Sequence, residues 1–269
     1  MTSLLLVGCG KMGQALLAGW LAEGLLPSRI VVVEPSGLTG PLAERSVRVV
    51  PDAASIPKTF SPDIVVLAVK PQVLPSVITA YAGYAKAVFL SIAAGKTLGW
   101  LSSQLGPEAP VVRAMPNTPA SVGRGITVCC ANGKVTAKAR KDCAKLLLAV
   151  GQVEWLEDEG LMDAVTAVSG SGPAYVFLLA ETMEAAGIRA GLPPDLAKKL
   201  ARATVSGAGE LLRLSEAEAS TLRENVTSPG GTTAAAVEVL TGGGSGNGLP
   251  VLMRDAVSAA IRRSRELAG

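Results

Sequence analysis

The sequence predicts an α/β domain with a parallel sheet, followed by a domain built only of helices. Over the first 160 residues, short runs of valine, isoleucine and leucine alternate with helical stretches, as in strand–helix–strand units. Beyond residue 160 the strand-like runs stop and alanine-rich helical periodicity takes over. A glycine-rich turn also joins the first strand to the first helix. We therefore expect two domains, residues 1–159 and residues 160–269.

Eight short apolar runs bounded by turn residues are expected to form strands. They are residues 4–7, 30–33, 47–50, 64–69, 87–92, 111–115, 125–130 and 152–156. The alternation of the first six with helices or loops is typical of parallel strands joined by right-handed crossovers. A helix is expected at 136–150, between the last two strands.

The second half predicts five helices with apolar residues at helical spacing. They are residues 161–187, 193–214, 216–225, 230–240 and 249–267. Ser215 and Glu218 have the spacing of a capping box before the third of them. Two glycines and a proline at 168–175 are costly inside a helix. That segment is either a kink that turns its serines and freed amides towards a site, or a break between two stacked helices.

The first strand runs into a glycine pattern that is typical of dinucleotide binding. Gly8 permits a tight turn, Gly10 lets the backbone approach a diphosphate, and Gly13 lets the helix pack close to the strand. The first amides of that helix are then free to bind phosphate oxygens. The residues expected to bind the cofactor here are Gly8, Cys9, Gly10, Lys11, Met12 and Gly13.

Glu34 closes the second strand, about 20 residues after the glycines, where an acidic residue commonly accepts a hydrogen bond from an adenosine ribose. That interpretation favours NADH over NADPH. Ser36 could instead hold a 2′-phosphate, or Glu34 could be a solvated strand end, so the choice between NADPH and NADH stays open.

Further small or turn-forming residues follow the fourth and fifth strands, at the edge where open α/β sheets bind ligands. The residues expected to line the cofactor there are Ala68, Val69, Lys70, Pro71, Ala93, Ala94 and Gly95. Simple turn chemistry is the alternative for both segments. Asn117 lies between two prolines after the sixth strand, and it marks either a site wall or a rigid corner.

A second glycine-rich loop, at residues 225–233, opens a helix far from any predicted strand. Successive amides of Gly230, Gly231 and Thr232 could form a nest sized for a carboxylate. We expect this second anion site to face the first across the domain boundary. The alternative is an ordinary helix N-cap supplied by Thr227 or Ser228.

Composition excludes several classes of function. The chain has no histidine, which removes Ser-His-Asp and Cys-His nucleophiles and histidine-based metal sites. Four cysteines lack metal-ligand spacing, and we expect them to be reduced. No run of basic residues predicts nucleic-acid binding, and no apolar run is long enough for a membrane span. No metal site is expected, and we expect a cytoplasmic protein without a signal peptide.

These motifs together resemble the pyrroline-5-carboxylate reductase family over essentially the whole chain. The similarity is carried by residues 8–13, 69–71, 169–175, 227–233, 255–257 and 263–267. It implies an α/β Rossmann-like N-terminal domain followed by an all-α C-terminal dimerisation domain, a helical domain like that of 6-phosphogluconate dehydrogenase. It also implies a homodimer, often assembled into a decamer of five dimers.

The resemblance implies reduction of 1-pyrroline-5-carboxylate to L-proline by NADPH or NADH, the last step of proline synthesis. By the same analogy the second glycine-rich loop holds the substrate carboxylate, and Thr233 is the catalytic residue beside the ring nitrogen. Asn225 matches a polar position close to the site, on the cofactor side. The residues implied to bind substrate are Ser228, Gly230, Gly231, Thr232, Thr233 and Glu216.

Two other functions fit the two-domain plan. A hydroxyacid dehydrogenase would need a base, commonly a lysine in the helical domain. Lys198 and Lys199 are the only lysines after residue 145, and their spacing suits a solvated helix face. A non-catalytic NAD(P)-binding regulator would keep the first glycine loop and would need no second anion site.

Overall fold

The computed structural model describes residues 2–84, 86–244 and 246–268. The chain divides into two compact units. The sheet unit comprises the residues up to 170 together with those from 261 onward, and the helical unit comprises residues 171–260. The domain limits 1–159 and 160–269 stay a prediction, and their outer ends, Met1 and Gly269, lie outside the described residues.

The sheet unit contains the eight predicted strands, each within two residues of the expected bounds. They are β1 (Leu4–Val7), β2 (Ile30–Val33), β3 (Arg48–Val50), β4 (Ile64–Leu67), β5 (Val88–Ser91), β6 (Val111–Met115), β7 (Gly125–Ala131) and β8 (Gly151–Trp155). The strand order is β3-β2-β1-β4-β5-β6-β7-β8. Strand order therefore reverses between β1 and β4, which makes this pair a topological switch point.

The first six strands are parallel, as predicted, whereas β7 runs antiparallel to β6. Residues 116–124 join β6 to β7 and hold only a 3₁₀ turn, Thr118–Val122. A parallel pair needs a crossover of a dozen or more residues, so this short connection allows only an antiparallel return. A longer helical crossover then brings β8 parallel to β7.

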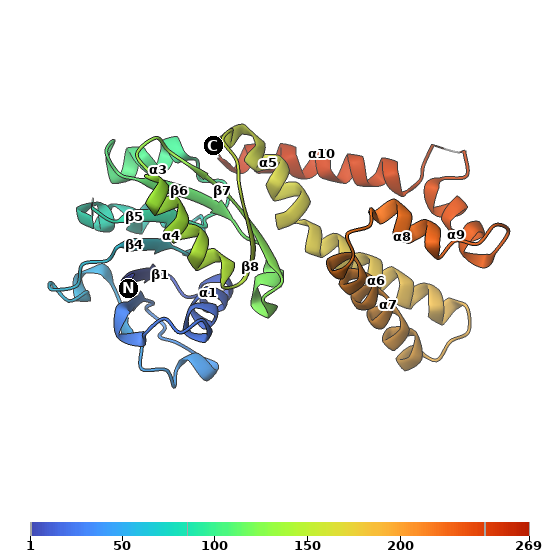
Figure 1. Ribbon diagram of the computed structural model, residues 1–269, viewed down its shortest axis with the longest axis horizontal. Helices are drawn as coiled ribbons and strands as arrows, with labels where there is room; N and C mark the ends of the chain where they lie inside the picture. The colour runs from blue at the N-terminus through green and yellow to red at the C-terminus, as the bar shows by residue number, and fades with distance from the viewer. Residues whose placement is uncertain (1, 85, 245, 269) are drawn as a thin grey trace. The chain divides into compact units, whose positions relative to one another are not determined.

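Helices cover both faces of the sheet, so the unit has two buried cores (Figure 1). The described α-helices of this unit are α1 (Lys11–Ala22), α2 (Leu74–Val77), α3 (Leu98–Leu105), α4 (Ala137–Leu148) and α5 (Met162–Val165). On one face Trp20 of α1 is buried, and its Nε1 donates to the Leu146 carbonyl of α4 at 2.9 Å. On the other face Leu74 and Leu101 pack against alternate strand residues. Successive side chains of a strand point to opposite faces of the sheet, so each buried strand contributes to both cores.

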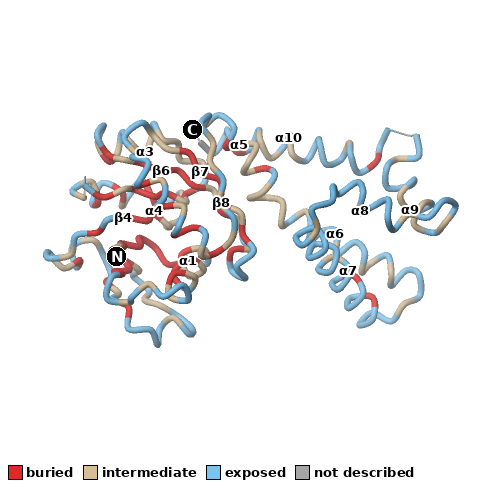
Figure 2. Tube along the Cα trace, viewed as in Figure 1, coloured by how far each residue is buried: buried red, intermediate tan, exposed pale blue. Residues whose placement is uncertain are grey.

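The helical unit has almost no core of its own (Figure 2). It contains α6 (Gly172–Arg189), α7 (Pro194–Leu214), α8 (Ala219–Asn225), α9 (Thr232–Thr241) and most of α10 (Leu249–Ala268). Among its described residues, Ala197 and Ala201 are the only buried apolar side chains. The far end of α10 belongs to the sheet unit, where the Ser264 hydroxyl donates to Asp163 Oδ1 at 2.7 Å.

The single helix predicted at 161–187 is divided into several elements in the structure. A π-helical turn, Thr166–Gly170, lies between α5 and α6. The Ser169 hydroxyl donates to the Val165 carbonyl at 3.0 Å, and whether the serines of this segment face a site stays a prediction. Pro173 lies in the first turn of α6, where a missing N–H costs nothing. The π-turn thus takes up the first glycine, and Ser171 separates it from α6, which begins at Gly172 with Ser171 as its N-cap.

The capping box predicted at Ser215 and Glu218 is wrong. Ser215 is the extended residue that ends α7, and its hydroxyl accepts a hydrogen bond from the Ala217 N–H at 3.1 Å. Helix α8 begins at Ala219, three residues later than expected, after Glu218. The serine hydroxyl bonds to the nearer amide because the chain leaves α7 in an extended conformation.

Candidate active site

The first glycine loop, between β1 and α1, has the geometry that its sequence predicted. Gly8 has φ +87°, and a Cβ there would lie 2.7 Å from Val69 Cγ1. A Cβ on Gly13 would lie 2.7 Å from the Gly8 carbonyl oxygen. Any larger residue at either position would push α1 away from β1 and β4, so both glycines are needed for the tight turn and the close packing.

Gly10 differs from its neighbours because a Cβ there would meet no heavy atom within 4 Å. Gly10 is the N-cap of α1, and its carbonyl accepts the first helical hydrogen bond, from the Gln14 N–H at 2.8 Å. The amides of Lys11, Met12 and Gly13 therefore have no acceptor within the helix. Open space beside three helix-terminal amides fits the diphosphate of a dinucleotide.

Cys9 is engaged within the loop. Its N–H donates to Glu34 Oε2 at 2.8 Å, and its side chain is buried. Burial, and then the charge of Glu34, raise the pKa of the Cys9 thiol to about 12. The thiol is therefore protonated at neutral pH and is no nucleophile. The link from Cys9 to Glu34 spans 25 residues of sequence and was not predicted from it.

Four predicted cofactor segments meet at one edge of the sheet. Residues 8–13, 34–36, 68–71 and 93–95 follow the carboxyl ends of β1, β2, β4 and β5, which are neighbours in the sheet. The Ala68 N–H donates to the Val7 carbonyl at 2.8 Å, which joins two of these segments at the switch point. Their assignment to a cofactor stays a prediction, and Asn225 belongs to the helical unit instead.

The neighbouring corner is held by side-chain hydrogen bonds. Asn117 Oδ1 accepts a hydrogen bond from the Ile126 N–H at 2.9 Å, so Asn117 braces a rigid corner, one of its two predicted roles. A further anchor was missed: buried Arg113 pairs with Glu159 at 2.7 Å. Glu159 Oε1 also accepts a hydrogen bond from the Leu98 N–H at 2.8 Å, which fixes the start of α3.

The second glycine loop is a tight turn that leads into α9. The Gly231 N–H donates to the Ser228 carbonyl at 3.0 Å, and Gly230 has φ +70°. This geometry corrects the predicted nest of three amides, because the Gly231 N–H already has an acceptor inside the loop. The amides of Thr232 and Thr233, in the first turn of α9, have none within the helix.

The alternative of an ordinary side-chain N-cap at this loop is wrong. The N-cap residue of α9 is Gly231, which has no side chain. The Thr227 hydroxyl donates back to the Arg223 carbonyl at 2.6 Å. Ser228, Glu216 and Asn225 are exposed. The amides at the start of α9 therefore remain open to a ligand such as a carboxylate.

The described residues contain neither a metal-binding cluster nor a membrane-spanning helix. No group of three or more histidine, cysteine, aspartate or glutamate side chains is arranged to hold a metal ion within residues 2–84, 86–244 and 246–268. None of the helices in that part of the chain is long and apolar enough to cross a membrane.

Known proteins resemble this chain along nearly its full length. A pyrroline-5-carboxylate reductase of Pseudomonas aeruginosa is 40% identical over 273 residues, which cover 97% of this chain and 95% of the relative. This chain belongs to the pyrroline-5-carboxylate reductase family. The family member from Synechocystis is 42% identical, with 97% of each chain covered. Residues 159–267 match the family described as pyrroline-5-carboxylate reductase dimerisation, and residues 3–95 match NADP oxidoreductase coenzyme F420-dependent.

Solved structures of the reductase family share this fold. A pyrroline-5-carboxylate reductase of Coxiella burnetii has a TM-score of 0.90 at 35% identity, with 100% of this chain and 99% of that chain covered. The Plasmodium falciparum enzyme, solved with NADP bound, has a TM-score of 0.84 at 30% identity, with 100% and 98% covered. The predicted family and the predicted fold class, a Rossmann-like domain followed by a helical dimerisation domain, are thereby confirmed.

Proposed function

We propose that this chain reduces 1-pyrroline-5-carboxylate to L-proline with a hydride from NADH or NADPH. The observation that carries the proposal is the full-length kinship to reductases named for that substrate. The kinship spans both the loop at Gly10 and the loop at Gly230. The first loop is built for a diphosphate and the second for a small anion.

The sheet unit holds the cofactor in this proposal. The amides of Lys11 and Met12 bind the diphosphate, and the exposed Lys11 ammonium adds a positive charge. The small residues at 93–95 leave room at the carboxyl ends of the strands for the rest of the dinucleotide. A bound nicotinamide supplies the hydride that adds to the imine carbon of the substrate.

The helical unit holds the substrate. The amides of Thr232 and Thr233 and that of Gly230 bind the carboxylate, and Glu216 and Ser228 contribute polar contacts nearby. The Thr233 hydroxyl orients the ring nitrogen and, through water, replaces its proton. A substrate that arrives as the protonated imine needs no strong general acid, which suits a chain without histidine. Catalysis then depends mainly on positioning.

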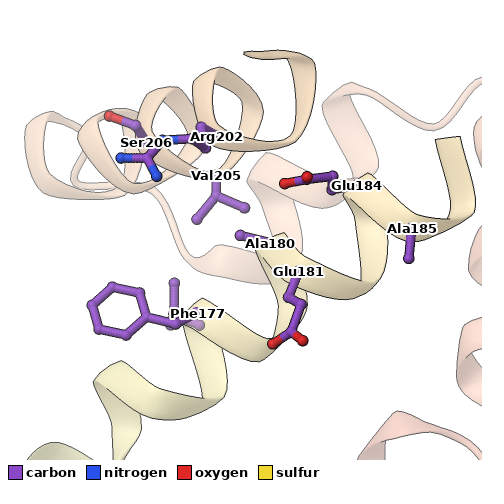
Figure 3. A pocket seen from close by; sticks show the side chains of 9 residues that line it. Phe177, Ala180, Glu181, Glu184, Ala185, Arg202, Val205 and Ser206 are labelled. Atoms are coloured by element: carbon purple, nitrogen blue, oxygen red, sulfur yellow. The ribbon is translucent and has the colours of Figure 1, made fainter. Parts of the chain in front are cut away.

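The helical unit also supplies the contacts of a homodimer in this proposal. A groove of about 610 Å³ runs between α6 and α7, lined by Phe177, Ala180 and Val205 among others (Figure 3). Phe177 is 67% exposed and Leu214 is 66% exposed in the single chain. Apolar surface on this scale is stable in water when a partner covers it. Assembly of five dimers into a decamer, a cytoplasmic location and the limits 1–159 and 160–269 complete the proposal, on the family resemblance alone.

The two other candidate functions receive less support. Lys198 and Lys199 lie exposed on α7, as a solvated helix face predicts, and neither is placed as the base of a hydroxyacid dehydrogenase. A non-catalytic regulator gives no reason for an open helix start at α9.

One assay separates the three functions. Purified chain is mixed with a reduced nicotinamide cofactor and pyrroline-5-carboxylate, or with the oxidised cofactor and a 3-hydroxyacid. The proposal expects the absorbance of the reduced cofactor to fall in the first mixture, with one proline formed for each cofactor oxidised. Turnover in the second mixture alone would indicate the dehydrogenase, and turnover in neither would indicate the regulator.

A further inference from the structure

Glu34 joins the end of β2 to the first glycine loop. Its Oε2 accepts a hydrogen bond from the Cys9 N–H at 2.8 Å. Its Oε1 accepts hydrogen bonds from the Ser36 hydroxyl at 2.6 Å and from the Ser36 N–H at 3.3 Å. The carboxylate is therefore fixed in place beside the loop that precedes α1.

The Glu34 carboxylate can accept only one further hydrogen bond. A carboxylate has about four acceptor positions on its two oxygens and no donor. Both positions of Oε1 are occupied, and Oε2 retains one. The Ser36 hydroxyl, which was the candidate to hold a 2′-phosphate, donates its proton to Glu34 instead. The site can thus accept from a hydroxyl but offers no hydroxyl proton to a phosphate.

The charge at this position is negative, and Glu34 forms no direct ion pair with a described side chain. Partial burial raises the pKa of Glu34, but the hydrogen bonds from Ser36 and from Cys9 outweigh it, so the pKa lies below its usual value. The carboxylate is ionised at neutral pH. A 2′-phosphate carries a charge of about −1.5 to −2 at this pH, and a carboxylate held beside it repels it.

We propose that Glu34, held by Cys9 and Ser36, selects NADH over NADPH in this chain. The open position on Oε2 accepts the hydrogen bond of the ribose 2′-hydroxyl, and the fixed negative charge repels a 2′-phosphate. The inference rests on the proposed function, since it names the cofactor of that reaction. It sets this chain apart from the Plasmodium falciparum relative that was solved with NADP bound.

The decisive variant is Glu34→Gln, which keeps an acceptor for the Cys9 N–H and removes the charge. The measurement is kcat and KM for NADH and NADPH with pyrroline-5-carboxylate as substrate. In the unmodified chain, kcat/KM favours NADH roughly 10- to 30-fold, the effect expected when a carboxylate lies about 4 Å in water from a phosphate that carries a charge of about −1.5 to −2. In the variant, KM for NADPH falls by about the same factor, KM for NADH rises a few-fold, and kcat stays the same.

A matched control makes the same charge change elsewhere. Glu23 ends α1, and the 12 residues of that helix put it about 18 Å from the glycine loop. Glu23→Gln leaves both KM values unchanged. A role of Glu34 in loop structure alone would raise both KM values equally in Glu34→Gln and leave the preference unaltered, which would overturn the inference. A preference of the unmodified chain for NADPH would overturn it as well.

A binding titration separates this inference from the proposed function. Tryptophan fluorescence reports the binding of NADH and of NADPH without substrate. Tighter binding of NADH, reversed in Glu34→Gln, together with no turnover of pyrroline-5-carboxylate would support the cofactor selection and reject the proposed reaction. Turnover together with equal binding of the two cofactors would support the proposed reaction and reject the cofactor selection.

Discussion

The sheet unit and the helical unit of this chain are stabilised in different ways. In the sheet unit, Trp20 and Phe89 are fully buried in cores on opposite faces of one sheet. Among the described residues of the helical unit, only Ala197 and Ala201 are buried apolar side chains, whereas Phe177 is 67% exposed. The sheet unit thus buries its apolar surface within its own fold, whereas the helical unit, which matches the dimerisation family, leaves much of its apolar surface exposed.

The proposed cofactor loop and the proposed substrate loop lie in different units. The loop at Gly10 belongs to the unit with its own core, and the loop at Gly230 belongs to the unit without one. Cofactor binding is therefore expected to survive in a single chain. Substrate binding and turnover are expected to depend on dimer formation. Helices with few buried contacts open easily, so in a single chain the loop at Gly230 would not be held in a fixed position.

The largest expected effect is that of Phe177→Glu. A charge at this position cannot be covered by an apolar partner without a large desolvation cost, so the variant is expected to be monomeric and to lose turnover. Sedimentation velocity and the reductase assay measure the two effects. Leu148→Glu is the control, since Leu148 is 57% exposed on α4 of the sheet unit, and it should keep both properties. A paired, fully active Phe177→Glu would contradict the comparison.

Trp20→Ala tests the core of the sheet unit. It removes a buried ring and the hydrogen bond to the Leu146 carbonyl. The free energy of unfolding should fall by about 3–5 kcal/mol, as for other large-to-small core substitutions. Circular dichroism in urea measures the change. A loss below about 1 kcal/mol would show that this core matters less than its burial indicates.

Thr233→Ala tests the chemistry of the helical unit without disturbing its fold. Loss of one hydrogen bond to the reacting group should lower kcat by about 10- to 100-fold, with the Kd of the reduced cofactor unchanged. Gly10→Ala is the matched variant in the other loop. Its added Cβ meets no protein atom within 4 Å, so it should weaken cofactor binding and leave the secondary structure intact. Unchanged steady-state kinetics in Thr233→Ala would remove Thr233 from the mechanism.

The smallest effect concerns the four cysteines, all of which lie buried in the sheet unit. Burial raises the pKa of Cys130 to about 11 and that of Cys143 to about 12. Thiolates therefore form in the native chain only in strong alkali, and a disulfide reagent at pH near 8 should label none of the four until urea unfolds the unit. Phe177→Glu should leave this protection unchanged, whereas rapid labelling of that variant would mean that the sheet unit also depends on pairing.

Much of the sheet unit could be predicted from sequence because its signals are local. Short aliphatic runs end at glycine, proline or charged residues, and this placed all eight strands within two residues. The direction of β7 was not predicted, since it depends on how few residues connect it to β6. The partner of Glu34 was not predicted either, because a hydrogen bond to Cys9 joins two strand ends that become neighbours only in the folded sheet.

The helical unit was predicted less well at the ends of its helices. Its helix interiors follow a clear apolar period, but competing polar contacts decide where each helix starts. Ser215 bonds to the Ala217 amide and ends one helix where it was expected to begin another. The Gly231 N–H donates to the Ser228 carbonyl, so α9 begins at Thr232 and not at residue 230 as expected. Such choices between near-equal local hydrogen bonds are not encoded in residue type alone.

The most direct test of this account is to sediment the enzyme while it works. In such a run, pyrroline-5-carboxylate and NADH are present in the centrifuge cell. The position at which the NADH absorbance falls marks the active species. We expect activity to sediment at twice the mass of one chain or at a larger even multiple. Activity that sediments at the mass of a single chain, or no consumption of NADH at any position, would contradict it.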